Sequence, residues 1–144
     1  MKIRRANLPD VACLAAIENV QPASAGWGER GWQTELNTAA AQIWCAEQNG
    51  EVIGFVSIRL AAGWAEILNV AVHPHYCRQG IGSTLLAQVW QELKKQGAQE
   101  VTLEVNAKNI PAIALYKKMG LQETGRREKF YHHTDDALIM GRRL

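Results

Sequence analysis

One stretch limits the possible folds of this chain more than any other. An apolar, strand-like run at residues 67–72 is followed by a glycine-rich turn at 78–83 and a helical pattern at 84–96. The start of a helix leaves about four backbone N–H groups unpaired and carries roughly half a positive charge. Glycines let the backbone approach a phosphate closely. The order therefore predicts a phosphate-binding turn, to which Arg78 would add a charged contact.

The spacing of the glycines in this turn matches neither the G-x-G-x-x-G pattern of dinucleotide-binding folds nor the G-x-x-x-x-G-K-[ST] pattern of P-loops. The same residues would also suit an ordinary strand-to-helix turn with a helix cap. The turn by itself leaves both interpretations open.

Hydrophobic periodicity predicts an alternation of strands and helices along the rest of the chain. Strands are expected at residues 3–6, 42–47, 52–60, 64–73, 101–106, 121–127 and 137–142, and helices at about 7–19, 32–37, 81–96 and 109–119. Asn49-Gly50 predicts a tight hairpin. Residues 21–31 are expected to form a loop, and residues 128–136 a polar connection.

Two of these segments indicate how the sheet is built. The apolar run at 64–73 indicates a strand buried on both faces, hence a central one. The strand–helix–strand unit ending at 101–106 predicts a right-handed crossover between parallel strands, and the last two strands are expected to pair antiparallel. At 144 residues the chain is expected to be one domain, residues 1–144.

Composition argues against several classes of protein. The net charge of +2 is too small to indicate binding to nucleic acid or a membrane surface, and no apolar stretch approaches the ~20 residues that span a bilayer. Cys13, Cys45 and Cys77 form no C-x-x-C pair, which predicts reduced thiols in a cytoplasmic protein. We expect no signal peptide, because the strand-like start is not followed by an apolar segment.

Four short motifs follow one another between residues 69 and 121. They are Asn69-Val70-Ala71-Val72-His73-Pro74, Arg78-Gln79-Gly80-Ile81-Gly82, Leu103-Glu104-Val105, and the run from Asn109 through Ala114-Leu115-Tyr116-Lys117-Lys118-Met119-Gly120-Leu121. In this order and spacing the chain resembles the GCN5-related N-acetyltransferase (GNAT) family. Its tail, with Gly125-Arg126-Arg127, Phe130-Tyr131 and Asp136-Ala137-Leu138-Ile139-Met140, is most similar to the RimI-like enzymes, which acetylate the N-terminal alanine of a small-subunit ribosomal protein.

The resemblance implies a fold and a cosubstrate. The GNAT fold is α/β, with a mixed, mostly antiparallel central sheet that contains a parallel central strand pair and has flanking helices. The cosubstrate would be acetyl-CoA, bound by the backbone of Val70, Ala71 and Val72 at the pantetheine arm, by the turn at the pyrophosphate, and by Asn109. The turn residues are Arg78, Gln79, Gly80, Ile81, Gly82 and Ser83. The family turn is usually Q/R-x-x-G-x-G/A, whereas its first position here is Cys77.

By the same resemblance, Glu104 matches the family's general base and Tyr116 its general acid. The residue types suit the chemistry, because an α-amine with a pKa of about 7.7–8.0 must lose a proton before it attacks a thioester. A phenol can donate to the departing thiolate, and a backbone N–H near Val72 can polarise the thioester oxygen. Without the resemblance, Glu104 would be interpreted as a solvated strand residue and Tyr116 as a packing residue.

Trp27 and Tyr131 are the candidate acceptor contacts, in segments 21–37 and 128–136 that we expect to flank the acceptor groove. Trp27 would also suit a lid over the core, and it lies in Gly26-Trp27-Gly28, where RimI-like chains often carry Pro-Trp-Ser. The expected acceptor is a protein or peptide N-terminus, as on a small-subunit ribosomal protein. The alternatives are a lysine side chain or small amine, and a non-catalytic acetyl-CoA-binding domain, although such a binder needs neither Glu104 nor Tyr116.

Other polar clusters are interpreted without a metal. His73 and His75, and the group of His132, His133, Asp135 and Asp136, match no recognised ligand spacing, so we expect a solvated turn and loop. Cys77 beside Arg78 has features of a reactive thiol but is interpreted as a bystander. The sequence leaves the oligomeric state open, with a monomer favoured.

Overall fold

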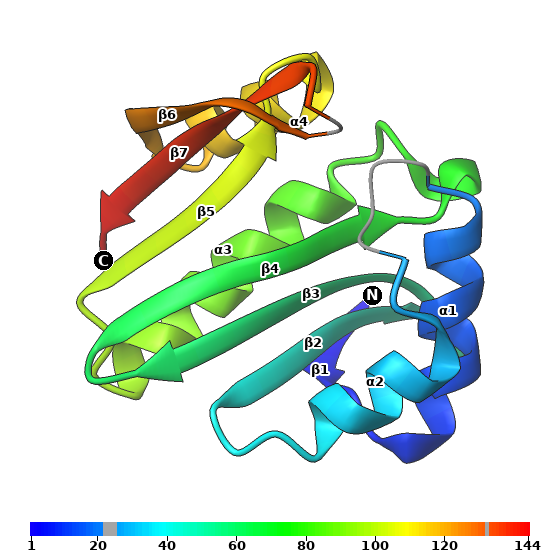
Figure 1. Ribbon diagram of the computed structural model, residues 1–144. Helices are drawn as coiled ribbons and strands as arrows, with labels where there is room; N and C mark the ends of the chain where they lie inside the picture. Colours follow the sequence, from blue (N-terminus) through cyan, green and yellow to red (C-terminus); the bar gives the residue numbers. More distant parts are fainter. Residues whose placement is uncertain (22–25, 132) are drawn as a thin grey trace.

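The computed structural model describes residues 1–21, 26–131 and 133–144. Within these, seven strands form one sheet in the order β1-β2-β3-β4-β5-β7-β6 (Figure 1). The strands are β1 (Lys2–Arg5), β2 (Ala41–Gln48), β3 (Glu51–Ala61), β4 (Trp64–Val72), β5 (Glu100–Asn106), β6 (Gln122–Tyr131) and β7 (Asp135–Arg143). The helices are η1 (Leu8–Asp10), α1 (Val11–Asn19), α2 (Gly28–Leu36), η2 (Pro74–Tyr76), α3 (Ile81–Lys95) and α4 (Ile110–Lys118), where η marks a 3-10 turn.

The sheet confirms the predicted mixed α/β class. Neighbouring strands pair antiparallel except β4 and β5, which pair parallel through Trp64–Ile67 and Glu100–Leu103. The connection between these two strands is α3, which passes behind β3 and β4 in Figure 1, whereas α2 lies in front of β2. Helices therefore cover both faces of the sheet. No helix of the described residues is long and apolar enough to cross a membrane.

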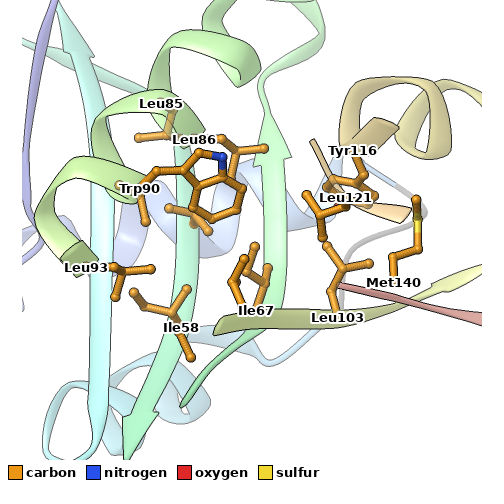
Figure 2. Close-up of a cluster of buried hydrophobic side chains, with 14 of the residues drawn as sticks. Ile58, Ile67, Leu85, Leu86, Trp90, Leu93, Leu103, Tyr116, Leu121 and Met140 are labelled. Atoms are coloured by element: carbon orange, nitrogen blue, oxygen red, sulfur yellow. The ribbon is translucent and has the colours of Figure 1, made fainter. Parts of the chain in front are cut away.

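The largest hydrophobic cluster lies between the sheet and the two C-terminal helices (Figure 2). From α3, Leu85, Leu86, Trp90 and Leu93 point at the strands, because residues three and four apart share one face of a helix. Each such side chain contributes about 1.5–3 kcal/mol when fully buried. A second cluster joins α1 and α2 to the opposite face, where the rings of Trp32 and Phe55 meet edge to face at 4.8 Å.

The helix that we expected at residues 32–37 begins earlier, at Gly28. Its first amides are bound by the carboxylate of Glu18, which accepts from the backbone N–H of Trp27 at 3.0 Å and of Gly28 at 3.2 Å. A cap supplied by another helix leaves no mark in the local sequence, so the glycines there indicated a loop. Residues 22–25 of that predicted loop, and His132, lie outside the described residues.

The last two strands are also longer than predicted. β6 continues to Tyr131 and β7 begins at Asp135, so most of the polar connection expected at 128–136 is strand. The register of the pair shifts between Arg127 and Tyr131, and Lys129 has a positive φ of 51°. An irregular, bulged ladder tolerates a charged segment that shows no alternation of apolar and polar residues.

One irregularity in β4 shapes the centre of the sheet. Ser57 pairs with Asn69 and Ile58 with Ile67, so Leu68 is an extra residue that forms a bulge. The parallel ladder with β5 ends at Ile67 and Leu103, just before this bulge. Beyond it, residues 69–72 of β4 pair only with β3, and Figure 1 shows β5, β7 and β6 leaning away from β4.

Candidate active site

A cavity of about 750 Å³ lies where β4 ends and the helices α3 and α4 begin. It is lined by Gln21, Val70, Ala71, Val72, Tyr76, Cys77, Arg78, Gly80, Ile81, Gly82, Ser83, Asn109, Pro111, Ala112, Ala114, Leu115, Tyr116 and Lys118. All the residues predicted to hold acetyl-CoA line it except Gln79, and so does the predicted acid, Tyr116. Glu104, Trp27 and Tyr131 are not in this lining. The structure thus joins three of the four sequence motifs around one cavity.

The exposed edge of β4 forms one wall. The backbone N–H of His73 donates to the Ile53 carbonyl at 2.8 Å, so this pair is hydrogen-bonded. In an antiparallel ladder the bonded pairs alternate with non-bonded ones. The backbone N–H and C=O groups of Val70 and Val72 therefore point away from β3. They point to the opposite edge of β4, where pairing with β5 has ended. The Gln21 side-chain amide donates to the Val72 carbonyl on that side.

The glycine turn forms the end of the cavity. Gly80 is the N-cap of α3 and has a φ of +75°, a left-handed conformation that glycine adopts without steric cost. The first helical hydrogen bond runs from the Thr84 N–H to the Gly80 carbonyl at 3.0 Å. The N–H groups of Ile81, Gly82 and Ser83 precede it and so have no acceptor within the helix. Three amides at the positive end of a fifteen-residue helix suit an anion.

A second glycine keeps the turn close to α4. A Cβ on Gly82 would lie 3.2 Å from Cδ2 of Leu115, so the missing side chain lets α3 and α4 approach each other here. At the start of α4, Asn109 is the N-cap and accepts from the Ala112 N–H at 3.3 Å. This cap and Pro111 start the helix at a fixed place, which brings Tyr116 to the cavity.

Tyr116 is only 8% exposed, and burial raises its pKa to about 12, with a smaller contribution from Tyr131. The pKa of Tyr131 is itself raised, first by burial and then by the negative charge of Glu104. The residues predicted to be acid and base thus each have an electrostatic influence on, or from, Tyr131.

The side chain of Glu104 lies on the face of the sheet opposite to α3 and α4. Val101, Leu103 and Val105 are buried against the helices, so the alternation of β5 directs Glu104 to the opposite face. Its carboxylate forms an ion pair with Arg127 of β6 at 3.1 Å, and the Arg127 guanidinium lies 5.3 Å from the centre of the Phe130 ring. β6 thereby holds Glu104 beside the opening between β4 and β5.

Trp27 lies in the layer formed by α1 and α2, where its ring packs on Trp32 at a centroid distance of 4.7 Å. Sequence reasoning did not assign a role to three polar residues next to the site: Glu18 and Asn69, which are buried and joined by a 3.1 Å hydrogen bond, and Gln21. The available signal was a glutamate on the apolar face of α1, because a charge in such a position must be satisfied by buried donors.

Among residues 1–21, 26–131 and 133–144, no group of three or more His, Cys, Asp or Glu side chains is arranged to hold a metal ion. The ring of His73 meets that of His75 edge to face at 4.9 Å, and its Nδ1 accepts the His75 N–H at 3.2 Å. Cys77 is exposed, with its Sγ 3.7 Å from the Val72 carbonyl oxygen. Cys77 lines the cavity, whereas His73 and His75 do not.

The fold and the site together define a class of protein. The sequence model of the acetyltransferase (GNAT) family matches residues 13–121, and the chain belongs to this family. Over 96 residues it is 42% identical to the ribosomal protein bS18-alanine N-acetyltransferase of Escherichia coli K12, a match that spans 65% of this chain and only 65% of that relative.

Two longer matches cover nearly the whole chain. The N-alpha-acetyltransferase of Sulfurisphaera tokodaii is 31% identical over 152 residues, which cover 96% of this chain and 90% of that one. The crystal structure of the ribosomal-protein-S18-alanine N-acetyltransferase from Escherichia coli superposes with a TM-score of 0.86 at 30% identity, covering 99% of this chain and 92% of the other.

The raised pKa of Tyr116 predicts how stability depends on pH. Below about pH 10 the phenol is neutral in both the folded and the unfolded chain, whereas between about 10 and about 12 only the unfolded chain ionises it. The free energy of unfolding should therefore fall as the pH rises through this interval, and Tyr116→Phe should remove part of that fall. Urea denaturation at about pH 8 and about pH 11 measures it. An equal fall in both proteins would contradict the raised pKa.

Proposed function

We propose that this chain is an acetyl-CoA-dependent N-acetyltransferase of RimI-like type, built as one GNAT domain over residues 1–144. It would transfer acetyl to the free α-amine of a protein N-terminus, with a ribosomal-protein alanine as the favoured acceptor in the cytoplasm. The observation that carries the proposal is the meeting of an exposed β4 edge, a glycine-capped helix N-terminus and a buried phenol in one cavity. The names of the Escherichia coli relatives support the choice of acceptor.

The cavity suits each part of acetyl-CoA. The free amides of Ile81, Gly82 and Ser83 would hold the pyrophosphate, and Arg78 would add a charge-assisted contact. The amides of the pantetheine arm would pair with the backbone of Val70 and Val72, as an added strand pairs with a sheet edge. Asn109 would contact the cosubstrate from the start of α4. The acetyl group would then lie at the opening between β4 and β5, between Tyr116 and Glu104.

The reaction follows from that position. The neutral α-amine attacks the thioester carbonyl carbon, an N–C bond forms and the C–S bond breaks. Glu104, directly or through a water molecule, takes the proton that the nitrogen loses. The Tyr116 phenol, with a pKa of about 12, is protonated at neutral pH and gives its proton to the departing sulfur, so that coenzyme A leaves as a thiol; solvent then returns a proton to the phenol. A backbone N–H near Val72 polarises the thioester oxygen.

The acceptor would enter from the face that carries Glu104. Tyr131, whose pKa is raised by burial and by the charge of Glu104, would contact the first residue of an extended peptide, with Trp27 across the groove. The two substrates would thus arrive from opposite faces of the sheet and meet where β4 and β5 part. A free N-terminus suits this arrangement, because a lysine side chain needs a longer, narrower channel to reach the same depth.

Cosubstrate binding should depend on Gly80. We expect acetyl-CoA to raise the melting temperature of the wild-type protein, and Gly80→Glu to abolish this shift, since the carboxylate would repel the phosphates. Gly97→Glu is the matched control, because Gly97 also has a positive φ and an open Cβ direction but lies at the other end of α3. It should lose similar stability yet keep the shift. Retained binding in Gly80→Glu would remove the turn from the site.

Glu104→Gln should lower kcat by about 100-fold or more, and most strongly below the pKa of the amine, where deprotonation is hardest. Steady-state kinetics across pH would measure this. Glu100→Gln is the control, because Glu100 lies on the same face of β5 and pairs with Arg143 at 4.0 Å, but at the far end of the strand. Full activity of Glu104→Gln at neutral pH would refute the role of base.

The acceptor class is tested by competition for labelled acetyl-CoA. The three acceptors are a peptide with a free N-terminal alanine, the same peptide already N-acetylated and carrying an internal lysine, and a simple polyamine. We expect the free N-terminus to be acetylated fastest. Faster turnover of either of the others would make this a lysine or small-amine acetyltransferase, and binding without turnover of any acceptor would leave a binding domain.

A further inference from the structure

A buried carboxylate lies next to the site and is not part of it. Glu18 of α1 is 5% exposed, and its side chain accepts hydrogen bonds from four described donors. Oε1 accepts from the Gly28 N–H at 3.2 Å and the Trp32 indole at 2.7 Å. Oε2 accepts from the Trp27 N–H at 3.0 Å and the Asn69 amide at 3.1 Å. A charge at this depth is stable only with such compensation.

The four donors belong to two parts of the protein. Three come from α2 and its N-cap, namely the backbone amides of Trp27 and Gly28 and the indole of Trp32, and the fourth is the side chain of Asn69 in β4. Asn69 directly follows the Leu68 bulge and directly precedes Val70, whose backbone faces the cavity. Glu18 is therefore the point at which the segment carrying Trp27 is bonded to the strand that would hold acetyl-CoA.

Simpler roles do not account for all four bonds. Capping of α2 requires only the Trp27 and Gly28 amides, and the apolar cluster of α1 and α2 already packs these helices on the sheet. The backbone of Asn69 is held by its pairing with Ser57 in β3. The bond from Asn69 to Glu18 is needed for neither, yet it fixes the distance between the two sides of the site. Glu18 is buried and each of its carboxylate oxygens already accepts two hydrogen bonds, so it is not placed to take a proton from an entering amine.

We infer that Glu18 is a positioning residue that acts through Asn69: it sets the Trp27 segment, on the acceptor side, relative to β4, on the donor side. The inference rests on the proposed function, because it takes that segment to be one wall of the acceptor groove. It adds that this wall is held by a buried hydrogen-bond network around one carboxylate rather than by the local sequence of the loop.

Two variants test the link. Glu18→Gln replaces one oxygen by an NH₂ group, which must face two of the four donors. Asn69→Ala removes the amide that joins the network to β4 and leaves the carboxylate in place. Because a hydrogen bond to a charge contributes enough to change a constant about tenfold, each variant should raise KM for the peptide about tenfold. The dissociation constant for acetyl-CoA, measured by calorimetry, should change less than about twofold, and kcat at saturating peptide only slightly.

Glu35→Gln is the matched control. Glu35 is also 5% exposed and lies in α2, but it bonds to Arg59 of β3 at 2.8 Å and not to a residue of β4. This variant should lose stability in urea while KM for the peptide stays at the wild-type value. If Glu18 were only a structural residue, all three variants would lose stability and none would raise KM selectively.

A second measurement does not require turnover. Hydrogen exchange of the Trp27 and Gly28 amides should accelerate about tenfold in both Glu18→Gln and Asn69→Ala, and remain unchanged in Glu35→Gln. Unchanged exchange in Asn69→Ala, or equal rises of KM and of the acetyl-CoA dissociation constant, would overturn the inference. If the wild-type protein acetylates no amine, the proposed function fails, and the exchange experiment still decides whether Glu18 and Asn69 position this segment.

Discussion

The site depends on the loss of one strand pairing in the middle of the sheet. β4 and β5 pair in parallel only as far as Ile67 and Leu103, and the extra residue Leu68 turns the end of β4 away from its neighbour. Backbone groups on a strand edge that no neighbouring strand covers need another hydrogen-bond partner. An edge that ends beside a helix N-terminus and a cavity is therefore suited to a ligand with an amide-containing arm and phosphates at its far end.

The same opening connects the two faces of the sheet. On one face, α3 and α4 supply the glycine turn and Tyr116; on the other, Arg127 of β6 pairs with Glu104. Tyr131 interacts electrostatically with both Tyr116 and Glu104, although one projects from α4 and the other from β5. A group transfer between a donor and an acceptor that enter from opposite sides requires such a passage. The hydrogen bond from Asn69 to Glu18 joins β4 to α1 next to this opening.

The sequence predictions were accurate where the deciding interactions are local and inaccurate where they join distant segments. The strand expected at 64–73 and found at Trp64–Val72, the glycine turn and α3 were predicted because their apolar runs, cap and stop signal are local. The expected burial of that strand on both faces was wrong, since only alternate residues are buried. The start of α2 was misplaced because its cap, Glu18, is ten residues from Gly28 and in another helix. The extent of β6 was underestimated because its burial pattern, exposed at nearly every position, contains no alternation to read. The bulge at Leu68 could not be predicted from the sequence, because an apolar residue within an apolar run is also what a regular strand would have.

The sequence by itself determined the order of the elements, the conformational freedom at Gly80, and the presence of a carboxylate and a phenol in motifs typical of the acetyltransferase (GNAT) family, because each is fixed by residue type and spacing. Only the tertiary structure decided that Tyr116 is buried while Glu104 is held by Arg127, and that Val70 and Val72 face an opening. Those properties depend on which strand stops pairing with which, and pairing between segments more than thirty residues apart is set by the packing of the whole sheet against its helices.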